Sequence, residues 1–400
     1  MDKPKVVLGV SGGIAAYKAC ELLRRLTESG HDVRVVPTAS ALNFVGAPTW
    51  SALSGHPVST EVWSDVHEVP HVRIGQEAEL VVVAPATADL LAKAAHGLAD
   101  DLLTNTLLTA RCPVVFAPAM HTEMWEHPAT QENVATLRRR GALVIEPAVG
   151  RLTGVDTGKG RLPEPAEIFE VCRSVLARGV RTPDLVGRHV VISAGGTREP
   201  LDPVRYLGNR SSGKQGYALA RTAAARGAKV TLIEANTGFA DPAGVDVLHA
   251  GTAVQLREAV VKAALQADVV VMAAAVADFR PAAYAAGKIK KKEGQEPAPV
   301  ALVRNPDILA EISADRSRPG QIVVGFAAET DDVLANGRDK LRRKGCDLLV
   351  VNEVGERKTF GSEENEAVVL AADGGETPVP YGPKEALAET VWDLVAARLS

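Results

Sequence analysis

Short, continuously apolar runs alternate with longer amphipathic segments along the chain, and turns rich in glycine separate them. Apolar runs of this length are typical of strands buried in a parallel sheet, whereas apolar positions three and four apart indicate helices. The predicted strands are residues 6–10, 33–37, 80–84, 114–117, 190–192, 230–234 and 269–273. The predicted helices are residues 14–28, 167–176, 214–226, 252–266 and 383–399. This alternation predicts an α/β fold with mainly parallel sheets flanked by helices.

Length and hydrophobic content favour two domains of ordinary size. The chain has 400 residues, of which 46% are hydrophobic, and this is enough for two separate cores. Residues 178–187 carry glycine, proline and charge between the predicted helix 167–176 and the predicted strand 190–192, and we place the linker there. The sequence therefore predicts two Rossmann-like domains, residues 1–180 and residues 187–400.

Charge and cysteine usage narrow the possible functions. A formal net charge of -4 gives no sign of nucleic-acid binding. The cysteines lie far apart, without a CxxC pair, at Cys20, Cys112, Cys172 and Cys346. This spacing argues against a disulfide framework and a zinc site, and it fits a reducing cytoplasm. The N-terminal apolar run is interrupted by Gly9 and is too short for a signal peptide or a membrane span, so we expect a cytoplasmic protein without membrane attachment.

Two glycine-rich turns are candidate phosphate sites, because glycine lets the backbone approach a phosphate and free amides at a helix start favour negative charge. Residues 208–214 read GNRSSGK, which matches most of a P-loop. However, Gln215 replaces the expected Ser or Thr, and the turn lies well downstream of the strand 190–192. The earlier turn, with Gly12 and Gly13, lacks the G-x-G-x-x-G pattern of dinucleotide sites. The earlier turn could therefore still bind a mononucleotide, and the later turn could bind a phosphate or a carboxylate.

Several longer motifs occur in a fixed order. The first half contains SGGIAAYK (11–18), PHVRIG (70–75), APATADL (84–90) and PAMHTEMW (118–125), which together resemble the homo-oligomeric flavin-containing cysteine decarboxylases. The second half contains GGTREPLDPVR, NRSSGKQG, AAVADFRP, KIKK and GFAAET, and it is similar to phosphopantothenate-cysteine ligase. Joined in this order, the halves resemble the bifunctional phosphopantothenoylcysteine decarboxylase/phosphopantothenate-cysteine ligase family of coenzyme A biosynthesis.

For the first half, the resemblance implies bound FMN. Its expected contacts are Ser11, Gly12, Gly13, Thr38, Ser40, Ala86, Thr87 and Asp89. A cysteine-derived carboxylate has no adjacent electron sink, and oxidation of the thiol carbon would provide one before CO2 leaves. His71 falls on the family's catalytic histidine, which handles the proton of this oxidation. Without the resemblance, His71 would be an ordinary loop histidine beside Pro70.

The resemblance also implies a substrate site in the first half, with two departures from the family. The expected contacts are His121, Met124, Asp156, Gly158 and Arg161. His121 stands where the family usually has an asparagine that holds the substrate carboxylate, and an imidazole can also donate a hydrogen bond. Gly154 stands where the family's flap has a cysteine that donates a proton in the final reduction. Apart from the resemblance, Met120, Met124 and Trp125 would be core residues, which is the default interpretation of a lone apolar cluster.

For the second half, the resemblance implies a CTP-dependent ligation. The expected CTP contacts are Ala273, Ala274, Ala275, Asp278, Lys288, Pro306, Asp307, Ile308, Leu309, Phe326, Lys340 and Lys344. Phe326 is expected at the end of a strand, and Asp278 would also bind Mg²⁺. Arg205 would bind substrate, Asn209 would handle the acyl-cytidylate, and Lys288 would stabilise the leaving pyrophosphate. Apart from the resemblance, a lysine run like the one that begins at Lys288 usually forms a solvated loop.

The implied reactants are 4'-phosphopantothenate, cysteine and CTP. The carboxylate of phosphopantothenate would attack the α-phosphate of CTP, and the amine of cysteine would attack the activated acyl group. The resemblance further implies a homo-oligomer built on trimers, up to a dodecamer. Two other hypotheses stay open. One is a ligase whose flavin domain has become regulatory or a scaffold, and the other is an NAD(P)-dependent reductase, which rests on the βαβ pattern alone.

Overall fold

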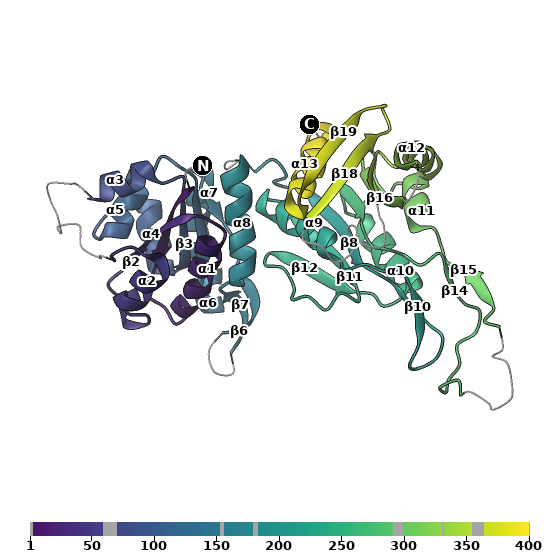
Figure 1. Ribbon diagram of the computed structural model, residues 1–400, viewed down its shortest axis with the longest axis horizontal. Helices are drawn as coiled ribbons and strands as arrows, with labels where there is room; N and C mark the ends of the chain where they lie inside the picture. The colour runs from purple at the N-terminus through teal and green to yellow at the C-terminus, as the bar shows by residue number, and fades with distance from the viewer. Residues whose placement is uncertain are drawn as a thin grey trace. The chain divides into compact units, whose positions relative to one another are not determined.

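The structure is a computed structural model in which the chain forms two compact units. It describes residues 3–58, 70–152, 156–178, 183–290, 299–329, 332–353 and 364–399. The first unit comprises Met1–Thr182 with Pro242–Gly244, and the second comprises Pro183–Asp241 with Val245–Ser400. Each unit has its own central sheet (Figure 1).

A five-stranded parallel sheet organises the first unit, in the order β2-β1-β3-β4-β5. Its strands are β1 (Lys5–Val10), β2 (Asp32–Pro37), β3 (Leu80–Ala86), β4 (Val114–Pro118) and β5 (Leu143–Val144). The helices are α1 (Ala16–Glu28), α2 (Ala47–Ser54), α3 (Pro70–Glu77), α4 (Ala88–His96), α5 (Leu102–Thr109), α6 (Thr122–Glu126), α7 (Pro128–Arg139) and α8 (Pro165–Arg178), with a 3-10 turn at Ala41–Asn43. An antiparallel hairpin of β6 (Ala148–Arg151) and β7 (Thr157–Arg161) precedes α8.

Alternating side chains of β1 face opposite layers of helices. Val6, Leu8 and Val10 belong to a core shared with α1, α2 and α8. Val7 belongs to a second core, shared with α3, α4, α5 and α7. Burial on both faces explains why this strand is continuously apolar. In open α/β sheets, ligands bind at the carboxyl ends of the strands.

An eight-stranded sheet organises the second unit, in the order β12-β11-β8-β13-β16-β17-β18-β19. Its strands are β8 (His189–Gly195), β11 (Lys229–Ala235), β12 (Val245–His249), β13 (Val269–Met272), β16 (Ile322–Glu329), β17 (Leu348–Glu353), β18 (Glu364–Ala371) and β19 (Glu376–Pro383). The helices are α9 (Lys214–Ala225), α10 (Ala253–Ala264), α11 (Ile308–Ala314), α12 (Val333–Lys344) and α13 (Lys384–Leu399). The strands from β12 to β17 pair in parallel, whereas β18 and β19 form an antiparallel edge.

Two layers of helices cover this sheet as well. Val190 and Ile192 of β8 pack in a core with α9 and α13, while Val191 packs in the opposite core with α10, α11 and α12. The indole nitrogen of Trp392 donates to the carbonyl of Leu219 at 3.0 Å, which joins α13 to α9. Figure 1 shows these two helices side by side.

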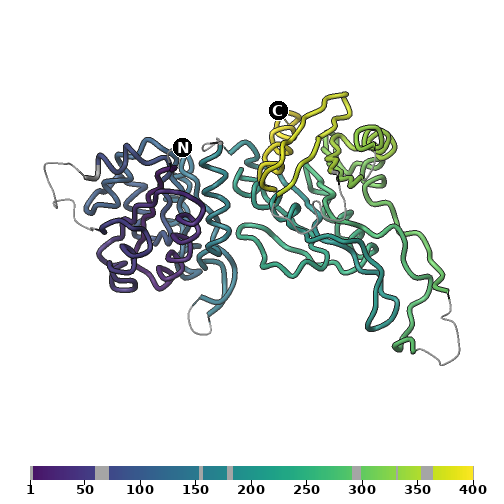
Figure 2. The backbone as a smooth tube through the Cα atoms, viewed as in Figure 1, coloured from purple at the N-terminus to yellow at the C-terminus, as the bar shows by residue number. Residues whose placement is uncertain are grey.

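Two antiparallel ribbons extend from the carboxyl edge of the second sheet (Figure 2). One pairs β9 (Arg198–Pro200) with β10 (Tyr206–Gly208), and the other pairs β14 (Phe279–Pro281) with β15 (Leu302–Arg304). The first ribbon follows β8 and the second follows β13, and β9 contacts β14. The ribbons therefore lie at the edge of the sheet where ligands are expected.

The predicted α/β fold class is confirmed in both units. All the strands and helices predicted from the pattern are present, with ends that differ by a few residues. Phe326 was expected to end a strand, but it lies inside β16, which continues to Glu329. The GNRSSGK turn follows the short β10 and not β8, unlike a P-loop. Among the described helices, none combines the length and the apolar character needed to cross a bilayer.

Candidate active sites

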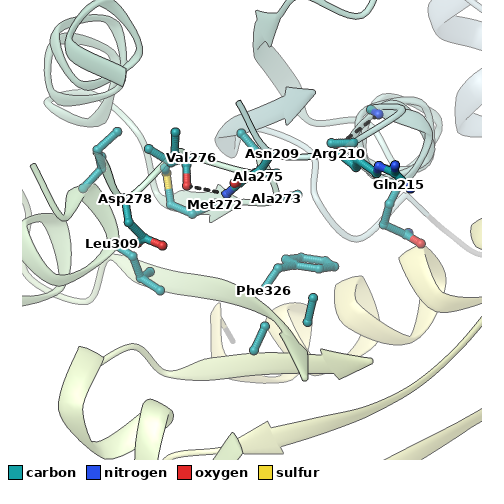
Figure 3. Close-up of a pocket in the computed structure, with 18 of the residues that line it drawn as sticks. Asn209, Arg210, Gln215, Met272, Ala273, Ala275, Val276, Asp278, Leu309 and Phe326 are labelled. Atoms are coloured by element: carbon teal, nitrogen blue, oxygen red, sulfur yellow. Dashed lines mark hydrogen bonds between the residues drawn. The ribbon is translucent and has the colours of Figure 1, made fainter. Parts of the chain in front are cut away.

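A cavity of about 800 Å³ opens at the carboxyl ends of β13, β16 and β17 in the second unit. Its walls include the start of α9, the turn after β13, the loop before α11 and two side chains of α12. Figure 3 shows Asp278 and Leu309 at one end of the cavity and Gln215 at the other, with Phe326 between them. Strand ends of this kind are where open α/β sheets bind their ligands.

The turn after β13 lines the cavity, and two buried hydroxyl groups fix its backbone. Ser193 Oγ accepts a hydrogen bond from the amide of Ala274 at 3.2 Å, and Thr197 Oγ1 accepts one from the amide of Ala277 at 3.0 Å. The exposed fractions of Ser193 and Thr197 are 0% and 1%. Because buried hydroxyl groups need hydrogen-bond partners, these two residues hold the backbone of the turn and do not face a ligand.

Two asparagine side chains also hold this turn. Asn209 Nδ2 donates to the carbonyl of Val276 at 3.0 Å, which is the dashed contact beside the Val276 label in Figure 3. Asn305 Nδ2 donates to the carbonyl of Ala277 at 2.8 Å, and the Asn305 amide donates to the carbonyl of Asp278 at 2.8 Å. Asn305 was not among the expected CTP contacts. The Asn-Pro pair that it forms is a turn signal that could have found it.

Two lysines of α12 line the cavity, and each is paired with a carboxylate. Lys340 Nζ lies 3.3 Å from Glu329 Oε1, and Lys344 Nζ is paired with Asp307. Burial acts to raise the pKa of Asp307, but Lys344 and the amide of Ala310 outweigh it and hold that pKa below its ordinary value. The spacing of four residues places both ammonium groups on one face of the helix. A polyphosphate at this end would compete with the two carboxylates for them.

The other end of the cavity is built on the start of α9. Gly213 has a φ of 78°, and a Cβ there would come within 2.3 Å of Thr237 Cγ2, so this position requires glycine. Gln215 Nε2 donates to the carbonyl of Lys384 at 3.0 Å, and Asn365 Nδ2 lies 3.4 Å from Gln215 Oε1. Sequence analysis missed Asn365 and Lys384, because they come from β18 and α13, far from α9 along the chain.

The cavity gathers nearly all the residues that were expected to contact CTP. Those that line it are Ala273, Ala274, Ala275, Asp278, Pro306, Asp307, Ile308, Leu309, Phe326, Lys340 and Lys344, together with Asn209. Lys288 and Arg205 do not line it. Lys288 is exposed after β14, and Arg205 is paired with the buried Asp202. In the part of the chain that the structure describes, Asp278 belongs to no cluster of three or more His, Cys, Asp or Glu side chains that could hold a metal.

In the first unit, three loops meet at the carboxyl edge of the sheet. Ser11 Oγ donates to the carbonyl of Pro85 at 2.7 Å and accepts from the amide of Thr87 at 2.9 Å. Gly12 lies so close to Ser40 that a Cβ would come within 2.4 Å of Ser40 Cβ. These contacts bring the loops after β1, β2 and β3 together. The loops, with the end of β3 and the first turn of α4, contain the residues expected to contact FMN, which are Ser11, Gly12, Gly13, Thr38, Ser40, Ala86, Thr87 and Asp89.

The loop after β1 fits a phosphate group. Within the described residues, the amides of Gly12 and Gly13 donate no hydrogen bond. They precede α1, whose N-terminus favours negative charge. A Cβ at Gly13 would find no neighbour closer than Thr87 Cγ2 at 3.8 Å, so there is open space beside this loop.

The hairpin of β6 and β7 packs on the loop after β4. The amide of Met120 donates to the carbonyl of Gly160 at 2.9 Å. A Cβ would come within 2.2 Å of Met120 O at Gly160, and within 2.2 Å of Thr122 Oγ1 at Gly158. These close approaches explain why both positions are glycine. Gly158 thus lies beside the loop that carries His121.

The remaining residues of the expected substrate site differ in their exposure and pairing. His121 and Asp156 are exposed. Met124 is 48% exposed and therefore not a core residue, whereas Trp125 is 3% exposed. Arg161 is paired with Glu164, which also binds Lys18 at 3.1 Å.

Two sequence predictions fall on residues that are described partly or not at all. His71 lies in the first turn of α3 and not in a loop, but its side chain is outside the described residues. Gly154, at the position of the family's flap cysteine, is also outside them. α3 packs on α5, where a Cβ at Gly75 would come within 2.3 Å of Thr109 Oγ1.

Comparison with known proteins relates each half of the chain to a family. Residues 1–177 match the Flavoprotein family, and residues 185–399 match the DNA/pantothenate metabolism flavoprotein C-terminal domain. The Coenzyme A biosynthesis bifunctional protein CoaBC of Mycolicibacterium smegmatis is 62% identical, covering 99% of this chain and 98% of its own. That of Vibrio cholerae is 43% identical, covering 98% and 97%. A crystal structure of the C-terminal domain of a CoaBC protein is 31% identical with a TM-score of 0.46, covering 54% of this chain and 98% of that domain.

The bifunctional relatives align with both units in one continuous match. Their similarity extends over nearly the full length of both chains, so it covers the flavoprotein half and the C-terminal half together. The two family matches divide the chain between residues 177 and 185. The chain therefore belongs to the family of bifunctional CoaBC proteins of coenzyme A biosynthesis.

Proposed function

We propose that the second unit joins 4'-phosphopantothenate to cysteine with CTP, and that the first unit decarboxylates the phosphopantothenoylcysteine formed. Both activities belong to the bifunctional family of which this chain is a member. The observation that carries the ligase assignment is the cavity, because residues from the turn after β13, from α11, from β16 and from α12 that were expected to contact CTP all line it.

The two ends of the cavity suit different parts of the ligase reaction. Lys340 and Lys344 offer positive charge for the CTP phosphates, and Asp278 offers one exposed carboxylate for Mg²⁺. Mg²⁺ usually takes one or two carboxylates together with substrate phosphates and water, so a single acid fits this role. The α9 end would take phosphopantothenate, whose carboxylate attacks the α-phosphate. No nucleophilic side chain is required for these steps.

The first unit fits a phosphate-bearing flavin, and we propose FMN. The amides of Gly12 and Gly13 would hold its phosphate, and Ser11 fixes the loop by bonding to the loop after β3. Bound FMN would supply the oxidising power that prepares the thiol carbon for loss of CO2. His121 would donate a hydrogen bond to the substrate carboxylate, and His71 would accept or move a proton.

One incubation tests both halves of the proposal. Purified protein is mixed with phosphopantothenate, cysteine, CTP and Mg²⁺, and pyrophosphate and CO2 are measured separately. We expect both products, with CO2 released only after phosphopantothenoylcysteine is present. Pyrophosphate without CO2, even from added phosphopantothenoylcysteine, would favour the alternative of a ligase with a regulatory or scaffold flavin domain. Nicotinamide turnover would favour the reductase hypothesis.

The proposed role of His71 predicts a variant that separates the two activities. His71→Asn should keep the flavin bound, because none of the expected FMN contacts is changed. It should lower CO2 release by roughly 10²-fold or more, because a positioned proton-transfer group contributes about this much. Pyrophosphate release should be unchanged. Decarboxylation at the wild-type rate would contradict the role of His71.

We also propose self-association through the first unit, in a trimer-based assembly. Ile14, two residues before α1, and Tyr17, in its first turn, are 66% and 60% exposed, and they follow the loop proposed to bind FMN. Exposed apolar residues next to a ligand loop favour a surface that another subunit covers. Light scattering measures the assembly directly, and a monomer at working concentration would contradict it.

A further inference from the structure

The segment that carries Lys288 is tied by its backbone to a distant turn. The amide of Ile289 donates to Asp202 Oδ2 at 3.1 Å, and the carbonyl of Ile289 accepts from Arg205 Nη2 at 2.8 Å. Further back, the amide of Ala285 donates to the carbonyl of Leu201 at 3.0 Å. The turn at residues 201–205 joins β9 to β10, so the first ribbon holds the chain that follows β14.

The two carboxylate oxygens of Asp202 have different partners. Oδ1 accepts from the amides of Val204 at 2.9 Å and Arg205 at 2.8 Å, and these bonds close the turn. Oδ2 accepts from Arg205 Nη2 at 2.6 Å, from Arg205 Nε at 3.1 Å and from the amide of Ile289. The side chain of Asp202 has an exposed fraction of 0%. Oδ1 therefore shapes the turn, while Oδ2 holds the segment.

We propose that Asp202 is a positioning residue for the ligase reaction, which acts by holding Ile289 and thereby setting the place of Lys288. The inference rests on the proposed function, because the position of Lys288 matters for catalysis only if the second unit uses CTP. Lys288 itself is exposed. Fixing the neighbouring backbone removes part of the entropy that this lysine would lose on meeting a phosphate.

Asp202→Asn separates the two roles of the carboxylate, which are to close the turn at residues 201–205 and to hold Ile289. The amide oxygen of asparagine can still accept from Val204 and Arg205, so the turn is kept. Its NH2 group would then face the donors of Arg205 and Ile289, and a donor cannot hold other donors. Glu199→Gln is the matched control, because Glu199 is also a buried carboxylate of this ribbon, is 1% exposed, and contacts the amide of Ala253 on α10.

Amide hydrogen exchange of the full chain without substrates tests the tether independently of catalysis. Peptides that cover residues 283–290 should exchange at least about tenfold faster in Asp202→Asn than in the wild type, because the Ile289 amide loses its acceptor. The same peptides should be unchanged in Glu199→Gln. Unchanged exchange in Asp202→Asn would overturn the inference, whatever the catalytic activity of the protein.

Ligase kinetics then test whether the tether acts through Lys288. Asp202→Asn should lower kcat by about tenfold with less than about a threefold change in the KM for CTP. In a Lys288→Gln background, the same substitution should have almost no further effect, because residues that act as one unit are not additive. An equal loss in both backgrounds would overturn the positioning role. Absence of ligase activity in the wild type would instead refute the proposed function and leave the exchange result standing.

A second variant covers the case in which Asp202→Asn fails to fold. Ile289→Pro removes the same hydrogen bond by changing its donor, since proline has no amide hydrogen. Ile289 is exposed, so this substitution leaves the buried Asp202 in place. It should reproduce the loss of kcat in the wild-type background and have no added effect with Lys288→Gln. A wild-type kcat in folded Ile289→Pro would overturn the inference.

Discussion

Small polar side chains at the strand ends mainly hold backbone. Ser11, Ser193 and Thr197 are each at most 2% exposed, and each hydroxyl group bonds to a neighbouring loop. A buried hydroxyl that loses its partner costs about 1–3 kcal/mol, so its substitution shifts the loop that it holds. Loss of activity in Ser193→Ala would therefore report the position of the turn after β13 and not a lost ligand contact.

A carboxylate–imidazole pair near the start of α9 leads to a pH prediction. His249 Nδ1 lies 2.8 Å from Glu234 Oε2, and this contact raises the pKa of His249 above its ordinary 6.5. Burial acts to raise the pKa of Glu234, but His249 and Thr237 outweigh it and hold that pKa below 4.5. The His249 contribution to stability is full below pH 6.5 and is lost as pH rises through its folded-state pKa. The Glu234 contribution is present above pH 4.5 and is lost as pH falls through its folded-state pKa.

Both contributions are therefore complete between about pH 4.5 and 6.5. NMR titration of the imidazole should give His249 a pKa above 6.5, and Glu234→Gln should return it toward 6.5, because Glu234 is the main cause of the shift. An unaltered titration of His249 in the variant would contradict the pairing.

At the residue scale, the sequence predicts contacts that follow strand ends and misses contacts between distant segments. Asp278 and Pro306 were expected at a site because the resemblance implies it, and their places after an apolar strand and before a helix are local properties that agree with this. Asn365 and Lys384 meet the cavity only because β18 and α13 fold back onto α9. The hydrophobic pattern does not show which distant segments pack together, and so it did not predict either residue.

At the scale of elements, α12 shows how one helix can offer charge to the cavity and to solvent. Lys340 and Lys344 line the cavity, whereas Arg342 is 76% exposed at its side chain and paired with Asp339 on the same helix. Leu341 belongs to the core beneath. A basic run on this helix therefore contains two kinds of residue, which its sequence alone does not distinguish.

This difference predicts unequal effects of neutralising two neighbouring charges. Lys344→Gln should lower kcat/KM for CTP by roughly tenfold or more, because it removes positive charge from the phosphate end of the cavity. Arg342→Gln should change it by less than about twofold, because exposed charges are screened. Steady-state kinetics at two salt concentrations provide the measurement. Equal, salt-sensitive losses would mean that α12 attracts CTP only through its overall charge.

The elements that the sequence predicts are those with a strong local pattern. β1, β3, β8 and β13 are buried on both faces and read as continuous apolar runs. β12 has no fully buried residue, and the strands of the β9–β10 and β14–β15 ribbons are three residues long, which is too short for a periodic pattern. Their positions depend on tertiary contacts such as that of Asp202 with Ile289, which are 87 positions apart.

At the scale of the whole molecule, each unit contains a complete core. The core clusters of the first unit contain residues from 6 to 175, and those of the second contain residues from 185 to 395. Leu185 has an exposed fraction of 0% and packs with β8 and α9. The second unit therefore begins several residues before its first strand, and we propose that it folds independently.

Two truncations test where that unit begins. A fragment from Pro183 keeps Asp184, which pairs with the buried Arg226, and Leu185, whose amide donates to the Arg226 carbonyl at 3.1 Å. A fragment from His189 loses both, and removal of a buried leucine costs roughly 2–5 kcal/mol. We expect the first fragment to fold and form phosphopantothenoylcysteine, and the second to melt about 5–15 °C lower. Leu185→Ala in the longer fragment should reproduce most of this drop. Equal melting temperatures of the two fragments would show that residues 183–188 lie outside the domain. A longer fragment that folds but is inactive would show that ligation needs the first unit.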